Sequence, residues 1–318
     1  MTVAWVIGAG GLLGSALCRT LHHQGTARFA LPERLCWNTP KTLEAQLAEA
    51  VQAFSLKVAA AKRWEIYWAA GVGAMSSTAD ALEPETQALA RLLCMLSKNS
   101  CLMQTPGTFA LASSAGAVYA QSNDSIITEA TTPGPTTAYG HEKLKQENLV
   151  REFAMAHGLA SALVARVSTI YGPGQATGKT QGLLTHIARR MLRNQPIQIY
   201  VPFDTIRDYI TADDAAAAVV QASNMAGNTH QVVMKIVAAE HPTTVAEIIS
   251  TFKRITRRSP RVVTSASKLS VLYSRRVQFK SIVLTECRSS KAISLPVGIA
   301  QLMMAERLAY VGFPVGNR

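Results

Sequence analysis

The sequence predicts an α/β fold, with a doubly wound parallel sheet and a smaller mixed lobe toward the C-terminus. Two observations predict it. Short apolar runs alternate with longer helical patterns over the first 170 residues, and glycines follow the first apolar run. Continuous apolar strands that alternate with helices are typical of a parallel sheet covered on both faces, and right-handed crossovers make such a sheet doubly wound, as in a Rossmann-type domain.

The first elements can be assigned in order along the chain. Residues 3–10 (VAWVIGAG) are a buried-strand run that ends in glycines, and residues 12–25 are a helical pattern closed by a glycine. A weak strand is expected at 27–31, and RLCWN at 34–38 could form a further strand. Residues 40–54 have the apolar spacing of a helix.

The next elements continue the alternation. Strands are expected at 65–72 (EIYWAAGV) and 108–115 (TFALASSA), with a helix at 84–98 between them. A helix at 136–157 is ended by a glycine, and the apolar run at 160–172 is another strand. The order strand, helix, strand predicts that the strands lie parallel in one sheet.

The composition excludes several classes of protein. Of the 318 residues, 48% are hydrophobic and 16% are charged, which is unlike a disordered chain or a coiled coil. The net charge of +12 favours an anionic partner. Basic residues are scattered, without the interleaved aromatic residues of single-strand binders, and no apolar stretch reaches the roughly 18 residues of a membrane span. We therefore expect no nucleic acid and no membrane as partner, and a phosphorylated small molecule is the remaining class of anionic partner.

The cysteines indicate the compartment. There are five, an odd number, and they show no C-x-x-C spacing. This pattern argues against a disulfide framework and against a structural metal site, so we expect no metal. A reducing, cytoplasmic location fits best.

The glycine-rich turn is the first motif that carries chemistry. In GAGGLLG, Gly8, Gly11 and Gly14 follow a strand and open a helix that begins near Leu12 and Leu13. Glycines at this spacing allow a tight turn and a close approach of the backbone to a pyrophosphate, which then faces the free N–H groups of the helix. The turn predicts a dinucleotide site, and a glycine turn without a ligand is the alternative.

The alternation of strands and helices also predicts how the chain divides into domains. Alternation loosens after Pro173, so we expect a dinucleotide-binding domain at residues 1–172. Residues 173–318 are then a mainly substrate-binding lobe, with some segments returning to the first domain.

Residues at the end of the second expected strand should bind the adenosine ribose of the cofactor. An acidic residue there usually binds the ribose of NAD, and an arginine accommodates the 2′-phosphate of NADP. Arg28 lies in this neighbourhood, with Arg34 nearby, and Glu33 is the nearest acid. The cofactor is therefore NAD or NADP, with a weak preference for NADP; surface arginines are the alternative.

A tyrosine and a lysine stand four residues apart at the expected start of a helix. Tyr139 and Lys143 would share one helix face, with Cβ atoms about 5–6 Å apart. A neighbouring ammonium favours the phenolate, so the pair can act as a proton-transfer unit. Ser113 and Ser114, at the end of an expected strand, could bind a substrate oxygen there. Simple packing of the tyrosine against the lysine stem is the alternative.

Six segments together resemble the extended short-chain dehydrogenase/reductase family, in its NAD(P)-dependent sugar-nucleotide epimerase/dehydratase branch. They match the family's motifs in order: GAGGLLG (8–14), YWAAGVG (67–73), SSAGAVYA (113–120), AYGHEK (138–143), RVSTIYGPGQ (166–175) and IRDYITADDAA (206–216). The resemblance covers residues 8–216 and is loose beyond them. Their common order is more specific than any single motif.

The resemblance implies roles for the catalytic residues. Tyr139 would be the general acid/base, and Lys143 would bind the nicotinamide ribose and lower the pKa of the tyrosine. Ser114, or else Ser113, would hold the reacting oxygen. Arg207 would contact the substrate diphosphate, with Arg276 as a second phosphate contact.

The resemblance also implies further cofactor contacts and an assembly. The cofactor would be bound by the glycine turn, by Ala69, Ala70 and Gly71 at the end of a strand, and by Thr169. Members of the family commonly dimerise through two helices per subunit, which here correspond to residues 84–98 and 137–157. We therefore expect a homodimer.

The sequence departs from the family pattern at several positions. Ala115 stands where the family usually has its catalytic serine or threonine, and Thr169 replaces an asparagine. The asparagine expected in the fourth helix is missing, and Glu85 lies in that region. Gly116 and Ala117 replace the Asp-Glu pair of the dehydratases, and neither can protonate a leaving hydroxyl.

These features favour a sugar-nucleotide 4-epimerase that works by transient hydride transfer. A keto-sugar reductase or dehydratase of the same family is the first alternative. A cofactor-binding protein with little catalysis is the second, because of Ala115 and Thr169.

Overall fold

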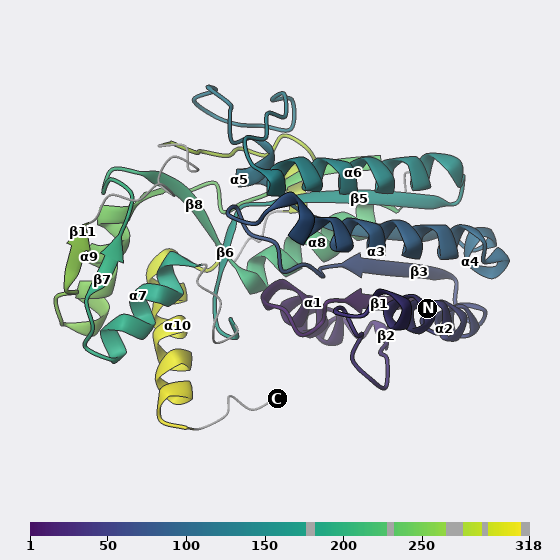
Figure 1. Ribbon diagram of the computed structural model, residues 1–318, viewed down its shortest axis with the longest axis horizontal. Coiled ribbons are helices and arrows are strands. Elements are labelled where there is room, and N and C mark those ends of the chain that lie inside the picture. Colours follow the sequence, from purple (N-terminus) through teal and green to yellow (C-terminus); the bar gives the residue numbers. More distant parts are fainter. Residues whose placement is uncertain (176–181, 228–231, 265–275, 288–291, 313–318) are drawn as a thin grey trace.

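The computed structural model describes residues 1–175, 182–227, 232–264, 276–287 and 292–312, and Figure 1 shows a large domain with a lobe beside it. The large domain is built on one parallel sheet of six strands in the order β2-β1-β3-β4-β5-β9. These strands are β1 (Thr2–Ile7), β2 (Ala27–Phe29), β3 (Arg63–Trp68), β4 (Gly107–Ser114), β5 (Ala160–Val167) and β9 (Val232–Val237).

Helices cover both faces of this sheet (Figure 1). One face packs against α1 (Leu12–His23) and α8 (Ala212–Ala226). The other packs against α2 (Pro40–Val58), α3 (Ala79–Ser97) and α6 (Ala138–Ala156). The short helices α4 (Ser100–Gln104) and α5 (Ala115–Val118) lie on either side of β4 in the sequence. The α/β class and the doubly wound parallel sheet predicted from the sequence are confirmed.

In the part of the chain that the structure describes, the lobe consists of small sheets and three helices. A three-stranded sheet has the order β10-β8-β6, and β11 pairs with β7. The strands are β6 (Thr169–Tyr171), β7 (Ile197–Ile199), β8 (Ile206–Thr211), β10 (Pro242–Thr244) and β11 (Val262–Thr264). The helices α7 (Leu183–Leu192), α9 (Val245–Thr256) and α10 (Leu295–Tyr310) share a hydrophobic core with β6, β7, β8 and β11. A short 3-10 turn, η2 (Thr285–Cys287), contributes Cys287 to the core between the main sheet and α8 instead.

The chain crosses between sheet and lobe more than once. β6 and β8 belong to the lobe, whereas α8 packs on the main sheet and β9 pairs in parallel with β5 as its last strand. Residues on both sides of position 173 therefore build the large domain.

Two short segments differ from the sequence prediction. Residues 34–38 do not form a strand. The side chain of Gln46 hydrogen-bonds the backbone of this segment: it accepts from Cys36 N at 2.8 Å and donates to Arg34 O at 3.4 Å. These two backbone groups therefore do not need a neighbouring strand as their partner. The predicted strand 160–172 is divided at Ser168, because the chain leaves the main sheet there and β6 pairs with β8 instead.

The sheet order creates a crevice between β1 and β3. Successive strands run from β1 to β2 on one side and then to β3 on the other, so the loops after β1 and β3 diverge at the carboxyl edge of the sheet. In open α/β sheets, ligands bind at this kind of switch point. Within the residues that the structure describes, no helix is long and apolar enough to cross a membrane.

Candidate active site

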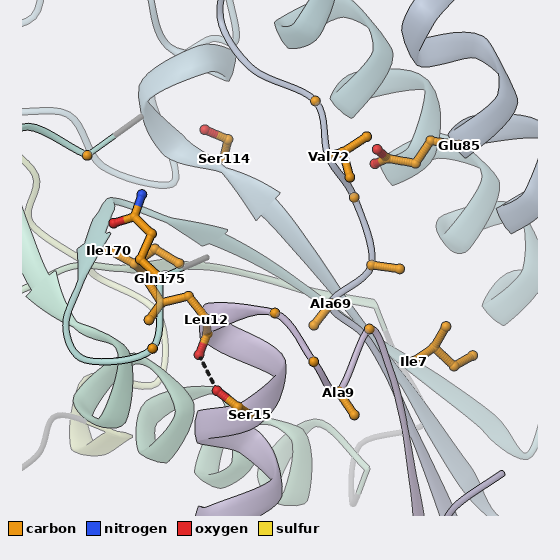
Figure 2. Close-up of a pocket in the computed structure, with 18 of the residues that line it drawn as sticks. Ile7, Ala9, Leu12, Ser15, Ala69, Val72, Glu85, Ser114, Ile170 and Gln175 are labelled. Atoms are coloured by element: carbon orange, nitrogen blue, oxygen red, sulfur yellow. Dashed lines mark hydrogen bonds between the residues drawn. The ribbon is translucent and has the colours of Figure 1, made fainter. Parts of the chain in front are cut away.

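A large cleft of about 2910 Å³ opens at the carboxyl edge of the main sheet and continues toward the lobe. Figure 2 shows its wall near the switch point, with Ala9 and Leu12 after β1, Ala69 and Val72 after β3, and Ser114 at the end of β4. Ile170 and Gln175 approach from the lobe side. One cleft therefore collects the ends of several elements that are far apart in the sequence.

The glycine turn fits closely under this cleft. Gly8 has a φ of +89°, and a Cβ at this position would lie 2.5 Å from Ala70 N. A Cβ on Gly14 would lie 2.0 Å from Gly8 O, so the first turn of α1 packs directly on the loop. Gly11 N donates to Gly8 O at 2.9 Å, which closes the turn before the helix. Backbone without side chains, at the start of a helix, forms a cradle that fits a pyrophosphate.

The other predicted cofactor residues lie around this turn. Leu12, Ala69, Ala70, Gly71 and Thr169 line the cleft. Leu13 does not point toward it: its side chain is 7% exposed and belongs to the core between the sheet and α1. Any contact of Leu13 with a cofactor would have to use its backbone.

The far end of the cleft lies beside β2. Arg28, Glu33 and Arg34 all line it and are all exposed. Trp37 stacks edge-on against Trp68 in the same region, with ring centroids 6.0 Å apart. The two arginines and the acid therefore all line the part of the cleft where the adenosine is expected.

Tyr139 lies in the first turn of α6. Thr137 begins this helix, and its Oγ1 accepts a hydrogen bond from Gly140 N at 3.2 Å. The tyrosine lines the cleft, and a Cβ built on Gly73 would lie 3.0 Å from Tyr139 Cδ2. The loop after β3 therefore passes close to the tyrosine ring at the cleft wall, with no room for a side chain at Gly73.

Lys143 lies one helical turn further on and is buried. Its Nζ is 5.6 Å from the centroid of the Tyr139 ring. It donates to Glu85 Oε1 on α3 at 3.1 Å and to Gln146 Oε1 at 2.9 Å. Burial by itself would lower the pKa of Lys143 most strongly, but the charges of Tyr139, Glu85 and Glu147 outweigh it and raise the pKa.

The two predicted serines have different surroundings. Ser113 is 6% exposed, and its hydroxyl donates to Glu147 Oε1 at 2.5 Å. Arg166 binds both oxygens of Glu147, with its Nη2 2.6 Å from Oε2. Ser114, in contrast, lines the cleft (Figure 2). The structure thus brings Ser114, and not Ser113, to the same cleft as Tyr139.

The predicted phosphate contacts lie on the lobe side. Arg207 on β8 lines the cleft, and its Nη1 donates to Ile206 O at 2.7 Å. Arg276 is exposed, and its backbone forms a bridge with Ile206, so the two arginines come from neighbouring chain segments. Asp208 next to them is 2% exposed and accepts hydrogen bonds from Ser168 Oγ at 2.6 Å and from two backbone N–H groups.

Sequence reasoning noted Glu85 only as a departure from a family pattern, and it missed Gln146, Glu147 and Arg166. These residues contact the predicted site from three elements. Gln146 and Glu147 follow Lys143 by three and four positions, so the helical period places them on the same side of α6. Charged or polar residues on the buried side of a helix are a signal that could have found them. Among the residues that the structure describes, no group of His, Cys, Asp or Glu could hold a metal ion.

Comparison with known proteins gives one family match and several relatives. The model of the NAD dependent epimerase/dehydratase family matches residues 4–236. A dTDP-L-rhamnose 4-epimerase of Burkholderia thailandensis is 33% identical over 91 residues, which are 28% of this chain and 25% of that protein. A UDP-glucose 4-epimerase of Azospirillum brasilense is 33% identical over 123 residues, 35% of each chain. The aligned stretches thus span about a quarter to a third of these relatives.

The solved structures resemble the whole chain. MoeE5, in complex with UDP-glucose and NAD, has a TM-score of 0.79 and 20% identity, and the match covers 98% of this chain and 100% of that chain. At this identity the likeness concerns the fold.

Proposed function

Because the chain belongs to the NAD dependent epimerase/dehydratase family, we propose that it is a sugar-nucleotide 4-epimerase in which Tyr139 is the general acid/base. The observation that carries the proposal is the position of Tyr139. Tyr139 lines the same cleft as the glycine turn, and the buried ammonium of Lys143 lies 5.6 Å from the centroid of its ring. MoeE5 has the same fold and was solved with UDP-glucose and NAD, which supports a UDP-sugar as the first substrate to test.

The residues divide into three tasks. The glycine turn and the loop from Ala69 to Gly71 would hold the cofactor, which when bound accepts a hydride from the sugar and returns it. Tyr139 would take the proton of the sugar 4-hydroxyl and later give it back. The charge of Lys143 would stabilise the negative charge that develops on the tyrosine oxygen during proton transfer. Ser114 would hold the 4-oxygen by a hydrogen bond, while Arg207 would bind the diphosphate.

Epimerisation fits the rest of the cleft better than dehydration does. Gly116 and Ala117 line the cleft next to Ser114. Neither residue carries an acid that could protonate a leaving hydroxyl, which a 4,6-dehydration requires. A 4-epimerase needs only proton transfer at the 4-oxygen and a hydride that returns on the other face of the sugar.

The test is a turnover assay with NAD⁺ and a panel of UDP-, dTDP- and GDP-sugars, with products separated by chromatography. We expect redox-neutral interconversion of two epimers and no net NADH. Net consumption of reduced cofactor would instead favour a keto-sugar reductase. Tyr139→Phe should lower kcat by about 10²–10⁴-fold, the usual contribution of an acid/base group. Unchanged turnover in this variant would contradict the proposed role of Tyr139.

The two serines provide an internal control. Ser114→Ala should lower kcat by about 10²-fold, since it removes a donor to the reacting oxygen. Ser113→Ala leaves one oxygen of Glu147 with one donor fewer, so it should act on stability and leave kcat close to that of the parent protein. The reverse pattern would assign the oxygen-holding role to Ser113.

We also propose that the protein forms a homodimer through α3 and α6. The two helices lie side by side on the same face of the sheet (Figure 1). Exposed Met155 at the end of α6, 77% accessible, is an apolar residue on this surface. Sedimentation equilibrium of the full chain tests the proposal, and a monomer at all concentrations would contradict it.

A further inference from the structure

Glu85, Lys143 and Gln146 form a closed ring of hydrogen bonds between α3 and α6. Lys143 Nζ is 3.1 Å from Glu85 Oε1, and the two side chains are 6% and 10% exposed. Gln146 accepts from the ammonium at 2.9 Å and donates to the same Glu85 oxygen at 3.1 Å. Thr86 Oγ1 accepts the second amide hydrogen of Gln146 at 3.2 Å. The position of the Lys143 ammonium therefore depends on Glu85 and Thr86 of α3, which bond the ammonium or its partner Gln146.

Of the two charged members of this ring, Glu85 lines the cleft and Lys143 does not. Glu85 lines the cleft, and Figure 2 shows its carboxylate beside Val72. A Cβ on Gly71 would lie 2.8 Å from Glu85 Oε1, so the carboxylate packs against the backbone of the loop after β3. Lys143 lies deeper, and only 5% of it is exposed. An ammonium has three donors, and Glu85 and Gln146 take two of them, which leaves one for the side on which Tyr139 lies.

We propose that Glu85 is a positioning residue for the reaction: by pairing with Lys143 it keeps that buried side chain in its ammonium form and fixes the direction of its remaining donor. The inference rests on the proposed function, because only a charged Lys143 can stabilise negative charge that develops on the Tyr139 oxygen during the reaction. It goes beyond that function by assigning an acid on α3 to the catalytic unit.

Burial is the physical reason for the assignment. A lysine without a counter-ion in such a place loses its proton readily. Tyr139 and Glu147 on α6 are the other ionisable groups that act on Lys143. Glu147 is bound in bidentate fashion by Arg166 on β5, so its charge is already compensated. Glu85 is therefore the acid that bonds the ammonium directly.

The experiment follows the ionisation of Lys143 in the substrate-free protein. Lysine is labelled with ¹³C, the Lys143 Cε resonance is assigned by its absence in Lys143→Arg, and its shift is followed with pH by NMR. In the wild type, Lys143 should remain an ammonium throughout the ordinary lysine range, because the charges around it raise its pKa. In Glu85→Gln, the midpoint should fall by about 1–3 pH units, the usual effect of an opposite charge at this range. The alkaline limb of kcat should move with it.

Two controls make the result decisive. Glu83→Gln changes an exposed acid on the same helix that bonds only to Gln87 among the described contacts, and it should leave the Lys143 midpoint unchanged. Glu85→Asp keeps the charge at a greater distance and should give a smaller fall than Glu85→Gln. Equal midpoints in wild type and Glu85→Gln overturn the proposal. Should Glu85→Gln fail to fold, a wild-type Lys143 that titrates well below pH 10 overturns it.

The readout also separates this proposal from the proposed function. No substrate is present during the titration, so a shifted midpoint in a protein that turns over no sugar nucleotide would refute the function alone. An unshifted midpoint together with a dead Tyr139→Phe variant would refute only the role of Glu85.

Discussion

Glu147→Gln should destabilise the protein strongly, because Glu147 and Arg166 form a buried ion pair under the candidate active site. Their side chains are 1% and 2% exposed, and the contacts are 2.6 Å for Nη2–Oε2 and 3.0 Å for Nε–Oε1. Arg166 also donates to Tyr119 OH at 2.5 Å, and Ser113 donates to Glu147. Every oxygen of this carboxylate is therefore used by a buried donor.

The magnitude follows from what the substitution leaves behind. An amide at position 147 keeps the shape but removes the charge, so the guanidinium stays buried without a counter-ion. Breaking such a pair costs about 3–5 kcal/mol, out of a total stability of about 5–15 kcal/mol. Burial acts most strongly to lower the pKa of Arg166, yet the bonds and charge of Glu147 raise it overall. An arginine remains charged at any ordinary pH even without that help, so the cost should not be relieved by deprotonation.

Urea unfolding at neutral pH measures the effect, with thermal unfolding as a second probe. We expect a loss of about 3–5 kcal/mol and a Tm lower by about 4–8 °C, since the unfolding entropy is about 2.1 cal/mol/K per residue. Glu83→Gln, an exposed acid on α3, is the matched control and should change stability by less than about 0.5 kcal/mol.

A double variant tests the reasoning itself. Replacing both members of the pair, in Glu147→Leu/Arg166→Met, removes both charges together and should cost less than the sum of the two single losses. The losses of stability of the two single variants could instead simply add up to the loss of the double variant, or Glu147→Gln could be as stable as the control. Either result would mean that the ion pair does not hold this region together.

Two further variants probe the glycine turn and the lobe. Gly14→Ala places a Cβ 2.0 Å from Gly8 O. This variant should lose about 1–3 kcal/mol of its free energy of unfolding and should bind NAD⁺ more weakly in calorimetry. Gly10→Ala is the control, because nothing lies within 4 Å of its Cβ, and it should leave stability unchanged. Burial raises the pKa of Asp208 against the opposing effect of the hydrogen bond from Ser168. The contribution of Asp208 to stability is therefore fully present below its unfolded pKa of about 3.9, and it is lost as the pH rises through the pKa of Asp208 in the folded protein. Asp208→Asn should remove that part of the pH dependence of urea unfolding, which begins above about pH 4, and an unchanged pH dependence would contradict the assignment.

Local patterns in the sequence were sufficient for much of the fold. The apolar run before Gly8 and the glycine spacing after it depend only on neighbours in the chain, and so does the Tyr139–Lys143 spacing on a helix. These signals placed the first strand, the turn and the start of α6 correctly. The 34–38 segment shows the limit of such reasoning, because a short apolar run with a tryptophan has the composition of a strand but finds its backbone partners on Gln46.

Contacts between distant segments could not be predicted in the same way. The pair of Glu85 and Lys143 joins residues 58 positions apart. Its formation depends on how α3 packs on α6, which no local period specifies. The contrast between the two serines has the same origin: adjacent residues on a strand point to opposite sides, but only the position of Glu147 decides which side is the buried one.

The crossing of the chain between sheet and lobe has a consequence for synthesis on the ribosome. The last strand of the sheet ends at residue 237, whereas its neighbour β5 ends at residue 167. At about 5–20 residues per second, the intervening stretch of chain takes several seconds to emerge. During that interval β5, all of whose residues are buried in the finished protein, has an unprotected edge. A nascent chain halted within this window should be the species that a chaperone most readily captures.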